Sequence, residues 1–200
     1  MTPIRDPGPS AQHPALGRPV VAIDVERADD VDAVRDVVAR AFGPDADEVV
    51  EMLDGLRATA EAWIPGLSFV ARLDDQPVGH VLLTRCWIET SRRRVDALML
   101  TPLSVVPEHQ GQGIGTALVA HALAVATAGG WPLVVLEGSP HFYGRRGFAA
   151  AEPLGFPSPS PEHIPAGAYQ VALLPDHEPW MTGTLVSSPP VAALNDLPRF

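Results

Sequence analysis

Apolar residues recur at helical spacing in two stretches near the start of the chain. Four valines between residues 31 and 38 follow Asp29-Asp30, and this pattern predicts a helix over residues 29–42 that begins at an acidic cap. Gly43-Pro44 should end that helix. A second helix is expected to begin near Asp45, because apolar positions again recur every three to four residues.

Short runs rich in β-branched and aromatic residues predict strands. Two of these runs, residues 67–73 and 77–83, flank Asp74-Asp75-Gln76 and predict a hairpin. Further strands are expected over residues 20–25, 95–106, 132–136, 169–174 and 182–186.

The stretch from residue 95 to residue 136 predicts a parallel crossover unit. Its first strand, residues 95–106, ends almost wholly apolar, which indicates burial on both faces. A helix is expected over residues 113–128, with Gly129-Gly130 as its stop, and a second buried strand follows. Strand, turn, helix and strand in this order indicate an α/β fold.

Both ends of the chain differ in composition from its middle. Residues 1–19 contain five prolines, too many for regular structure, and predict a flexible leader. Residues 189–200 are expected to form a loosely held tail. The globular domain should therefore span residues 20–188, a size that suits a single domain.

Composition and charge exclude several classes of function. The net charge of −10 argues against a nucleic-acid-binding surface. No apolar run approaches the roughly 20 residues of a membrane span, and no signal peptide is evident, so a cytoplasmic protein is expected. Cys86 is the single cysteine, which excludes an internal disulfide and a thiolate metal cluster, and the histidines lack ligand spacing.

All fourteen Lys and Arg positions are arginine. The missing lysine removes a pyridoxal phosphate Schiff base and a P-loop lysine from consideration.

A glycine-rich segment carries the strongest functional signal. Pro107 ends the predicted strand, and glycines then occupy positions 111, 113 and 115 at the start of the predicted helix. Such a turn lets backbone N–H groups converge on a ligand, and the positive end of the helix dipole points to the same place. We interpret it as a phosphate-binding loop rather than a turn whose glycines serve packing alone.

The details of this loop discriminate between phosphate ligands. A dinucleotide fingerprint requires a glycine where Thr116 stands, and a P-loop requires a lysine. The pattern Gln-x-x-Gly-x-Gly over residues 110–115 instead resembles the pyrophosphate loop of the GNAT acetyltransferase superfamily. The later segment Phe142-Tyr143-Gly144-Arg145-Arg146-Gly147-Phe148 also resembles that superfamily, in order and at about its spacing. Within it, the chain is similar to a branch of small bacterial predicted acetyltransferases.

The resemblance implies a fold and a co-substrate. It implies one α/β domain, in which a mixed, mostly antiparallel sheet of about six to seven strands is flanked by helices. A splayed parallel strand pair would hold acetyl-CoA, and no metal would be needed. Backbone groups of Ser104, Val105 and Val106 would pair with the pantetheine arm. Backbone amides would hold the pyrophosphate at Gln110, Gly111, Gln112, Gly113, Ile114, Gly115 and Thr116.

The chemistry of acyl transfer requires a neutral amine, a donor to the oxyanion and a proton for the leaving thiolate. By resemblance, the N–H of Val105 or Val106 is the oxyanion donor and Tyr143 is the general acid. A tyrosine hydroxyl holds its proton at neutral pH, which suits that role. For the general base, Glu137 at the mouth of the strand gap is the first candidate. The other candidates are His80, Glu89, His109 and a path through water molecules.

Two functions from different classes fit these residues. The first is an N-acetyltransferase that transfers an acetyl group from acetyl-CoA to a primary amine, of a small molecule or a protein, by direct attack in a ternary complex. The second is a non-catalytic acyl-CoA-binding sensor. Tyr143 and the intact loop favour the enzyme. The apolar closing strands could also form the seam of a homodimer.

Overall fold

A single sheet of eight strands runs through the computed structural model, which describes residues 21–195. The strand order is β1-β2-β3-β4-β5-β7-β6, with β8 paired to the outer part of β3. The strands are β1 (Ala22–Val25), β2 (Ser68–Leu73), β3 (Gln76–Thr90), β4 (Arg94–Val105), β5 (Leu133–Glu137), β6 (Ala149–Ala150), β7 (Tyr169–Leu173) and β8 (Gly183–Val186). All pairs are antiparallel except β4–β5.

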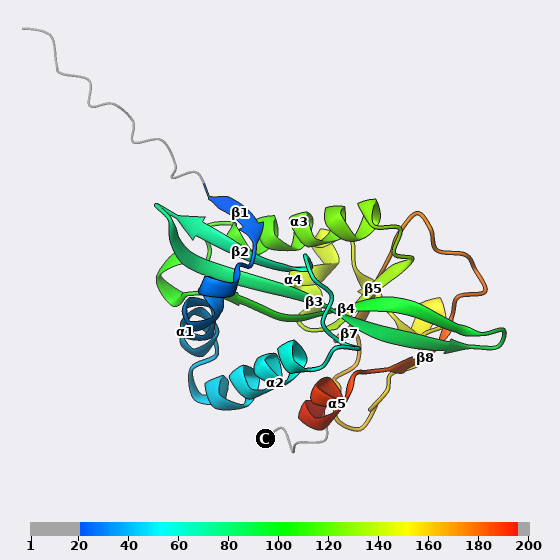
Figure 1. The fold of residues 1–200 in the computed structure, drawn as a ribbon. Coiled ribbons are helices and arrows are strands. Elements are labelled where there is room, and N and C mark those ends of the chain that lie inside the picture. Colours follow the sequence, from blue (N-terminus) through cyan, green and yellow to red (C-terminus); the bar gives the residue numbers. More distant parts are fainter. Residues whose placement is uncertain (1–20, 196–200) are drawn as a thin grey trace, which may run out of the picture.

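Helices cover both faces of this sheet (Figure 1). One face carries α3 (Ile114–Ala128), together with the short α4 (Pro140–Tyr143). The other face carries α1 (Val31–Phe42), α2 (Ala46–Ala58) and α5 (Pro189–Asn195). We call these the α3 face and the α1–α2 face.

The alternation of side chains along the strands produces the two apolar layers. On β3, Val81 and Leu83 pack in the layer of α3, while Leu82 and Ile88 pack in the layer of α1 and α2. Every one of these four side chains is fully buried. The sheet therefore has no solvent-facing side in its central part, as the apolar runs in the sequence predict.

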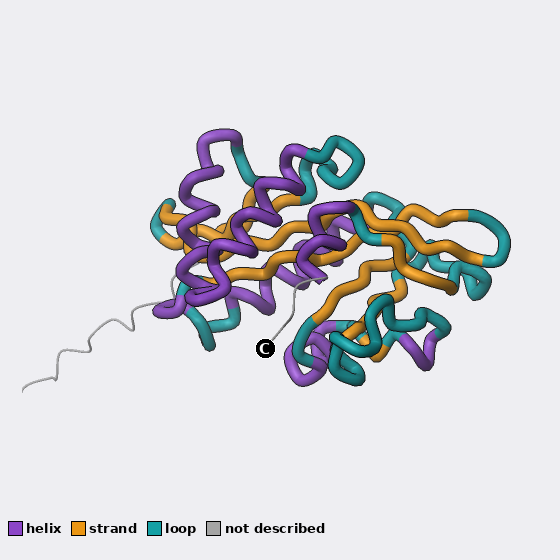
Figure 2. Tube along the Cα trace, turned by 90° about the horizontal axis from the view of Figure 1, so that it is seen from below, coloured by secondary structure: helices purple, strands orange, loops and turns teal. Residues whose placement is uncertain are grey.

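The long β3–β4 ribbon is the main element that the sequence described incompletely. The expected strand over residues 77–83 continues to Thr90, and the outer half of the ribbon extends past the helices at the right of Figures 1 and 2. β8 pairs with this outer half, from Trp87 to Thr90, which accounts for the strand expected over residues 182–186. Polar residues within the ribbon interrupt the apolar pattern, so the sequence predicted only its first part.

Strands β4 and β5 pair over only two residues before they separate. Leu98 lies opposite Val134 and Met99 lies opposite Val135, and no other pair joins the two strands. β4 nevertheless continues to Val105. The expected parallel pair and its splay are thus both present.

A bulge in β4 coincides with the separation. The β3–β4 register shifts between Val81 and Leu83, so that Thr101 and Pro102 together oppose one residue of β3. Bulges bend a strand and increase its local twist, and Pro102 has no N–H to offer a ladder. This local irregularity follows Met99 directly, at the point where β4 leaves β5.

Three further expectations differ from the structure or fall outside it. The sheet has eight strands where about six to seven were expected, and the one strand that no pattern predicted is β6, which is only two residues long. Residues 189–195 form α5 instead of a loose tail, and Val191 of that helix is buried against the core. The expected leader and the last five residues of the expected tail lie outside the described residues.

A buried polar cluster joins the α1–α2 face to the sheet edge. Glu26, which follows β1, is only 4% exposed and accepts hydrogen bonds from Arg57 at 2.6 Å and from the Ser68 hydroxyl. His80 Nε2 lies 2.9 Å from Ser68 Oγ and 3.5 Å from Glu26 Oε2. Burial alone would raise the pKa of Glu26, but hydrogen bonds from His80 and Ser68 and the charge of Arg57 lower it to about 2.

We expect Glu26→Gln to lower the free energy of unfolding by about 3 kcal/mol at neutral pH, because Arg57 would be left buried without its counter-charge. The pKa of Glu26 is lowered from 4.5 to about 2, so the contribution of the ionised carboxylate is complete above pH 4.5 and is lost as the pH falls toward 2. The measurement is chemical denaturation of both proteins across this pH range.

Glu89→Gln is the matched control, since Glu89 pairs with Arg94 at the exposed end of the ribbon. It should change stability little at any of these pH values. A Glu26→Gln variant as stable as Glu89→Gln would contradict the assigned cluster.

Candidate active site

The glycine loop leads from the end of β4 into α3 with its backbone turned toward open space. Gly111 and Gly113 have φ angles of +72° and +93°, which L-residues with a side chain rarely adopt. A Cβ built at either glycine would have no atom within 4 Å. Gly113 is the N-cap of α3, and the first N–H groups of a helix have no acceptor within it. The loop therefore offers N–H donors and a positive helix end to an anion.

Two glutamine side chains brace this loop from within. Gln110 Nε2 donates to the carbonyl of Val105 at 2.9 Å, and Gln112 Nε2 donates to the carbonyl of Glu108 at 3.0 Å. Both side-chain amides thus hold the shape of the turn. The backbone N–H groups of these residues remain available to a ligand. These are the groups that the resemblance implies for pyrophosphate binding.

Arg146 connects the loop to the second motif. Its Nε and Nη2 donate to Thr116 Oγ1, on the first turn of α3, at 3.1 and 2.5 Å. Its guanidinium also lies 3.6 Å from the centre of the Phe142 ring and donates to the Phe142 carbonyl. A positive charge is therefore fixed beside the N-terminus of α3. The sequence did not single out Arg146, because only the fold brings residue 146 to residue 116.

The backbone of β4 beyond the bulge has one edge on β3 and the other on the gap. The N–H of Val106 donates to the carbonyl of Val78 on β3 at 3.0 Å. Backbone groups alternate in direction along a strand, so Ser104 also faces β3, whereas Leu103 and Val105 face the gap. The gap is thus bordered by the backbone groups of Leu103 and Val105.

Tyr143 ends α4 and packs on the α3 face. Its ring makes edge-to-face contacts with Phe142 at 4.9 Å and Phe148 at 5.7 Å, measured between ring centres. A Cβ on Gly138 would lie only 2.4 Å from the Tyr143 ring, so the ring seats against bare backbone. Burial raises the pKa of Tyr143 to about 12, despite the nearby charge of Arg146. The hydroxyl therefore keeps its proton throughout the neutral range.

Glu137, the last residue of β5, lies on the opposite face from Tyr143. Leu133 and Val135, at the same parity, pack in the layer of α1 and α2, and Glu137 continues that row. Its cross-strand partner is Tyr169, whose hydroxyl is buried. Burial raises the pKa of Tyr169, and the nearby carboxylate of Glu137 raises it further. Glu137 and Tyr143 thus flank the end of β5 from different sides of the sheet.

The other residues considered from sequence are scattered. His109 lies in the loop with a partly exposed side chain, and Glu89 lies at the far end of the ribbon, paired with Arg94. Arg92 and Arg93 stack over Trp180 at 5.3 and 5.0 Å. They lie in the turn just before β4, roughly 35 Å along the strand from the loop. They are therefore too far from the glycine loop to contact a ligand bound there.

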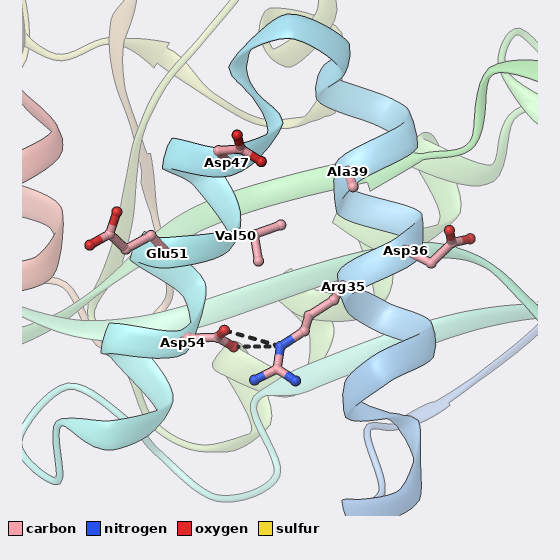
Figure 3. A pocket seen from close by; sticks show the side chains of 7 residues that line it. All are labelled: Arg35, Asp36, Ala39, Asp47, Val50, Glu51 and Asp54. Atoms are coloured by element: carbon pink, nitrogen blue, oxygen red, sulfur yellow. Dashed lines mark hydrogen bonds and ion pairs between the residues drawn. The ribbon is translucent and has the colours of Figure 1, made fainter.

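A groove of about 530 Å³ lies between α1 and α2 (Figure 3). It is lined by Arg35, Asp36, Ala39, Asp47, Val50, Glu51 and Asp54. Its one arginine already bonds to Asp54 at 3.0 Å, so carboxylates dominate its charge. Such a groove repels phosphate groups, whereas the glycine loop offers them N–H donors and a positive helix end.

Comparison with known families decides the membership of the chain. The family model described as acetyltransferase (GNAT) domain matches residues 23–151, more than half of the chain. The chain belongs to the GNAT acetyltransferase family. The matched residues contain the glycine loop, the splayed strand pair and Tyr143.

Relatives of this GNAT chain cover most of its length. The uncharacterized N-acetyltransferase YjhQ of Escherichia coli is 34% identical over 135 residues, which is 66% of this chain and 72% of the relative. A GNAT acetyltransferase from Brucella melitensis, solved with acetyl-CoA, is 29% identical and superposes with a TM-score of 0.69 over 87% of this chain and 99% of its own. YhbS of Escherichia coli, solved with CoA, has a TM-score of 0.77 at 23% identity, over 90% and 96% of the two chains.

The structure differs from the sequence prediction in which residues of β4 turn their backbone groups toward the gap. The sequence reading assigned the pantetheine arm to Ser104, Val105 and Val106, but the Val106 N–H is bonded to Val78 within the sheet. Ladder alternation turns Ser104 the same way. Among the three, Val105 alone faces the gap, and Leu103 is its neighbour along that edge. The bulge at residues 101–102 determines this phase, and pattern analysis does not reveal a bulge.

None of the helices between residues 21 and 195 is long and apolar enough to cross a membrane. Across the same residues, no three His, Cys, Asp or Glu side chains are grouped as metal ligands.

We expect Tyr143 to ionise near pH 12 in the native protein, well above the ordinary value of 10, because its ring is buried against Gly138. The chain has two tyrosines, so near-ultraviolet titration of the Tyr169→Phe variant reports on Tyr143 alone. Adding Gly138→Ala should displace the ring and bring the pKa down toward 10. A titration near 10 before that change would contradict the packing described for Tyr143.

Proposed function

We propose that this chain transfers an acetyl group from acetyl-CoA to a primary amine by direct attack in a ternary complex. One observation carries the proposal: the β4 edge that becomes free after Met99 leads, through the short 3-10 turn Pro107–His109, into the glycine loop. A ligand with an extended, amide-bearing arm and a pyrophosphate could bond to both parts at once. Acetyl-CoA has this shape, and the Brucella and Escherichia relatives were solved with acetyl-CoA and CoA.

The residues present fit such a ligand. Gly111 and Gly113 leave space where any side chain would intrude, and Arg146 adds a positive charge beside the loop. The gap-facing N–H and C=O of Leu103 and the N–H of Val105, whose carbonyl already accepts from Gln110, would pair with the amide groups of the arm, as a neighbouring strand would. When bound, acetyl-CoA supplies the acetyl group as an activated thioester.

The chain's own groups then have defined tasks. A backbone N–H of Leu103 or Val105 would donate to the carbonyl oxygen on which negative charge develops. The hydroxyl of Tyr143, protonated because its pKa is about 12, would give its proton to the leaving thiolate. Holding both reactants in one site supplies much of the rate, because it replaces a bimolecular encounter.

The amine should approach from the α1–α2 face. Tyr143 occupies the α3 face, so proton donation to the sulfur and proton removal from the nitrogen fall on opposite sides of the sheet. Glu137 lies on the α1–α2 face at the end of β5, and we propose it as one candidate for the group that draws the proton from the amine. The acceptor is a small molecule or a protein that presents such an amine.

Thiol release from acetyl-CoA, measured against a panel of primary amines, tests this function directly. Turnover with at least one amine supports the enzyme. Tight binding of acetyl-CoA with no turnover on any amine would favour the alternative, a non-catalytic acyl-CoA sensor.

We expect Tyr143→Phe to lower kcat about 100-fold while the affinity for acetyl-CoA stays within about a factor of two. The change removes the proton donor but keeps the ring that packs against Phe142 and Phe148. Steady-state kinetics and calorimetric titration with acetyl-CoA measure the two effects separately. An unchanged kcat would show that the thiolate departs without this proton.

We expect Gly113→Val to weaken acetyl-CoA binding by at least about 100-fold, because a branched side chain would enter the space that the loop opens to the pyrophosphate. Calorimetric titration measures the affinity, and the melting temperature without ligand separates a local effect from unfolding. Gly144→Ala is the control: Gly144 has helical backbone angles and open space around it, so affinity should persist. Retained affinity in Gly113→Val would contradict the assigned loop.

A further inference from the structure

Arg146 carries a charge that no carboxylate neutralises within residues 21–195. Six other arginines of these residues form ion pairs with Asp or Glu side chains. The groups around the Arg146 guanidinium are instead neutral: the Thr116 hydroxyl, the carbonyl of Phe142 and the ring of Phe142. In a chain with a net charge of −10, a positive charge held in place by neutral groups alone is available to an anion.

The guanidinium is fixed beside the first turn of α3. It lies 3.6 Å from the centre of the Phe142 ring, and that ring packs against Gly115, where a Cβ would lie 3.4 Å from it. Gly115 and Thr116 are the second and third residues of α3, and their N–H groups have no acceptor within the helix. The charge of Arg146 therefore lies next to the N–H groups that we propose for the pyrophosphate.

Arg146 also determines how Thr116 presents its hydroxyl. A threonine hydroxyl has two lone pairs and one hydrogen. Arg146 Nε and Nη2 donate to Thr116 Oγ1 at 3.1 and 2.5 Å, so both lone pairs are engaged and the hydroxyl hydrogen is left to donate. The Thr116 side chain is exposed, which makes this donor accessible to a ligand from solvent.

Arg146 keeps hydrogen-bond donors of its own. A guanidinium has five N–H groups, and the contacts with Thr116 and Phe142 use three of them. One N–H on each Nη nitrogen remains, and the side chain is partly exposed. Two N–H groups on neighbouring nitrogens can donate to two oxygens of one phosphate, which is the arrangement that suits arginine to phosphate.

We propose that the Arg146 guanidinium and the Thr116 hydroxyl bind a phosphate group of acetyl-CoA. Both side chains present donors on the same side as the free N–H groups of α3, and the helix end adds its own positive field. A phosphate offers only acceptor oxygens and negative charge, so one group can satisfy all of these donors. The pyrophosphate and the ribose phosphate of acetyl-CoA share this chemistry. The inference rests on the proposed function and adds two side chains to a site otherwise built from backbone.

Titration of Arg146→Gln with three thioesters tests the phosphate contact. The ligands are acetyl-CoA, acetyl-dephospho-CoA, which lacks the ribose phosphate, and acetyl-pantetheine, which has no phosphate. We expect binding of acetyl-CoA to weaken about 30-fold and binding of acetyl-pantetheine to stay within about a factor of two, because only the first loses charge-assisted hydrogen bonds. Calorimetry measures the two CoA compounds, and ligand-observed NMR titration measures the weaker third. An equal loss with acetyl-dephospho-CoA assigns the contact to the pyrophosphate, and no loss there assigns it to the ribose phosphate.

Two outcomes would overturn the proposal. One is an unchanged affinity of Arg146→Gln for acetyl-CoA. The other is an equal loss for all three ligands, since a merely structural role would not distinguish ligands with phosphate from one without. Arg92→Gln is the matched control, because it removes the same charge from an exposed arginine that stacks on Trp180, far from the loop. It should bind acetyl-CoA like the wild type, whereas an effect of net charge alone would appear in both variants.

Thr116 provides a second test, through its coupling to Arg146. Thr116→Ser keeps the hydroxyl and should bind acetyl-CoA like the wild type. Thr116→Val keeps the shape and the backbone N–H but removes one donor and releases the guanidinium, so affinity should fall about 10-fold. The double variant Thr116→Val, Arg146→Gln should lose less than the product of the two single losses, because each side chain positions the other. Losses that multiply in full would contradict the shared site.

These titrations need no acceptor amine, so they separate the phosphate contact from the transfer reaction. Wild-type protein that binds acetyl-CoA but acetylates no amine would refute the transferase, and the result for Arg146→Gln would still decide the contact. Wild-type protein that binds no acetyl-CoA would refute both.

Discussion

The separation of β4 from β5 is the constraint on which the rest of this structure depends. A parallel pair in a sheet core normally continues as a ladder, because unpaired backbone groups in an apolar interior are costly. Here pairing stops after Met99, and the bulge at residues 101–102 follows at once. The strand still continues to Val105 and presents one backbone edge to the gap. A ligand with its own amide groups could satisfy that edge, and the proposed binding of acetyl-CoA rests on this interruption of the sheet.

Contacts between residues far apart in the sequence connect the segments on the two sides of this gap. Arg146 joins the segment after β5 to Thr116 at the start of α3, across 30 residues of sequence. The ring of Tyr143 rests against Gly138, where no side chain could fit. The positions of Tyr143 and of the segment around it therefore depend on one missing side chain and one arginine. Both lie outside the loop that identifies the family.

The two faces of the sheet divide the chemistry. The α3 face carries the helix end that attracts an anion and the tyrosine that holds a proton up to a pKa of about 12. The α1–α2 face carries Glu137 and the cluster of Glu26 and His80. Since β4 lies between the two layers, the proposed proton donor Tyr143 and the proposed base Glu137 would reach the gap from opposite sides.

The sequence by itself determined the elements whose signals are local. Glycine at positions 111 and 113 and an apolar helix after them specify the loop, because positive φ and missing side chains are properties of single residues. The resemblance to the GNAT superfamily followed from that loop and the segment around Tyr143, and the family model over residues 23–151 then showed the membership. Only the tertiary structure decided which β4 groups face the gap, since the phase of a strand depends on a bulge shared with its neighbour. It also decided that Arg146 meets Thr116 and that His80 meets Ser104, because pairing between strands or across a helix end depends on three-dimensional register rather than on sequence spacing.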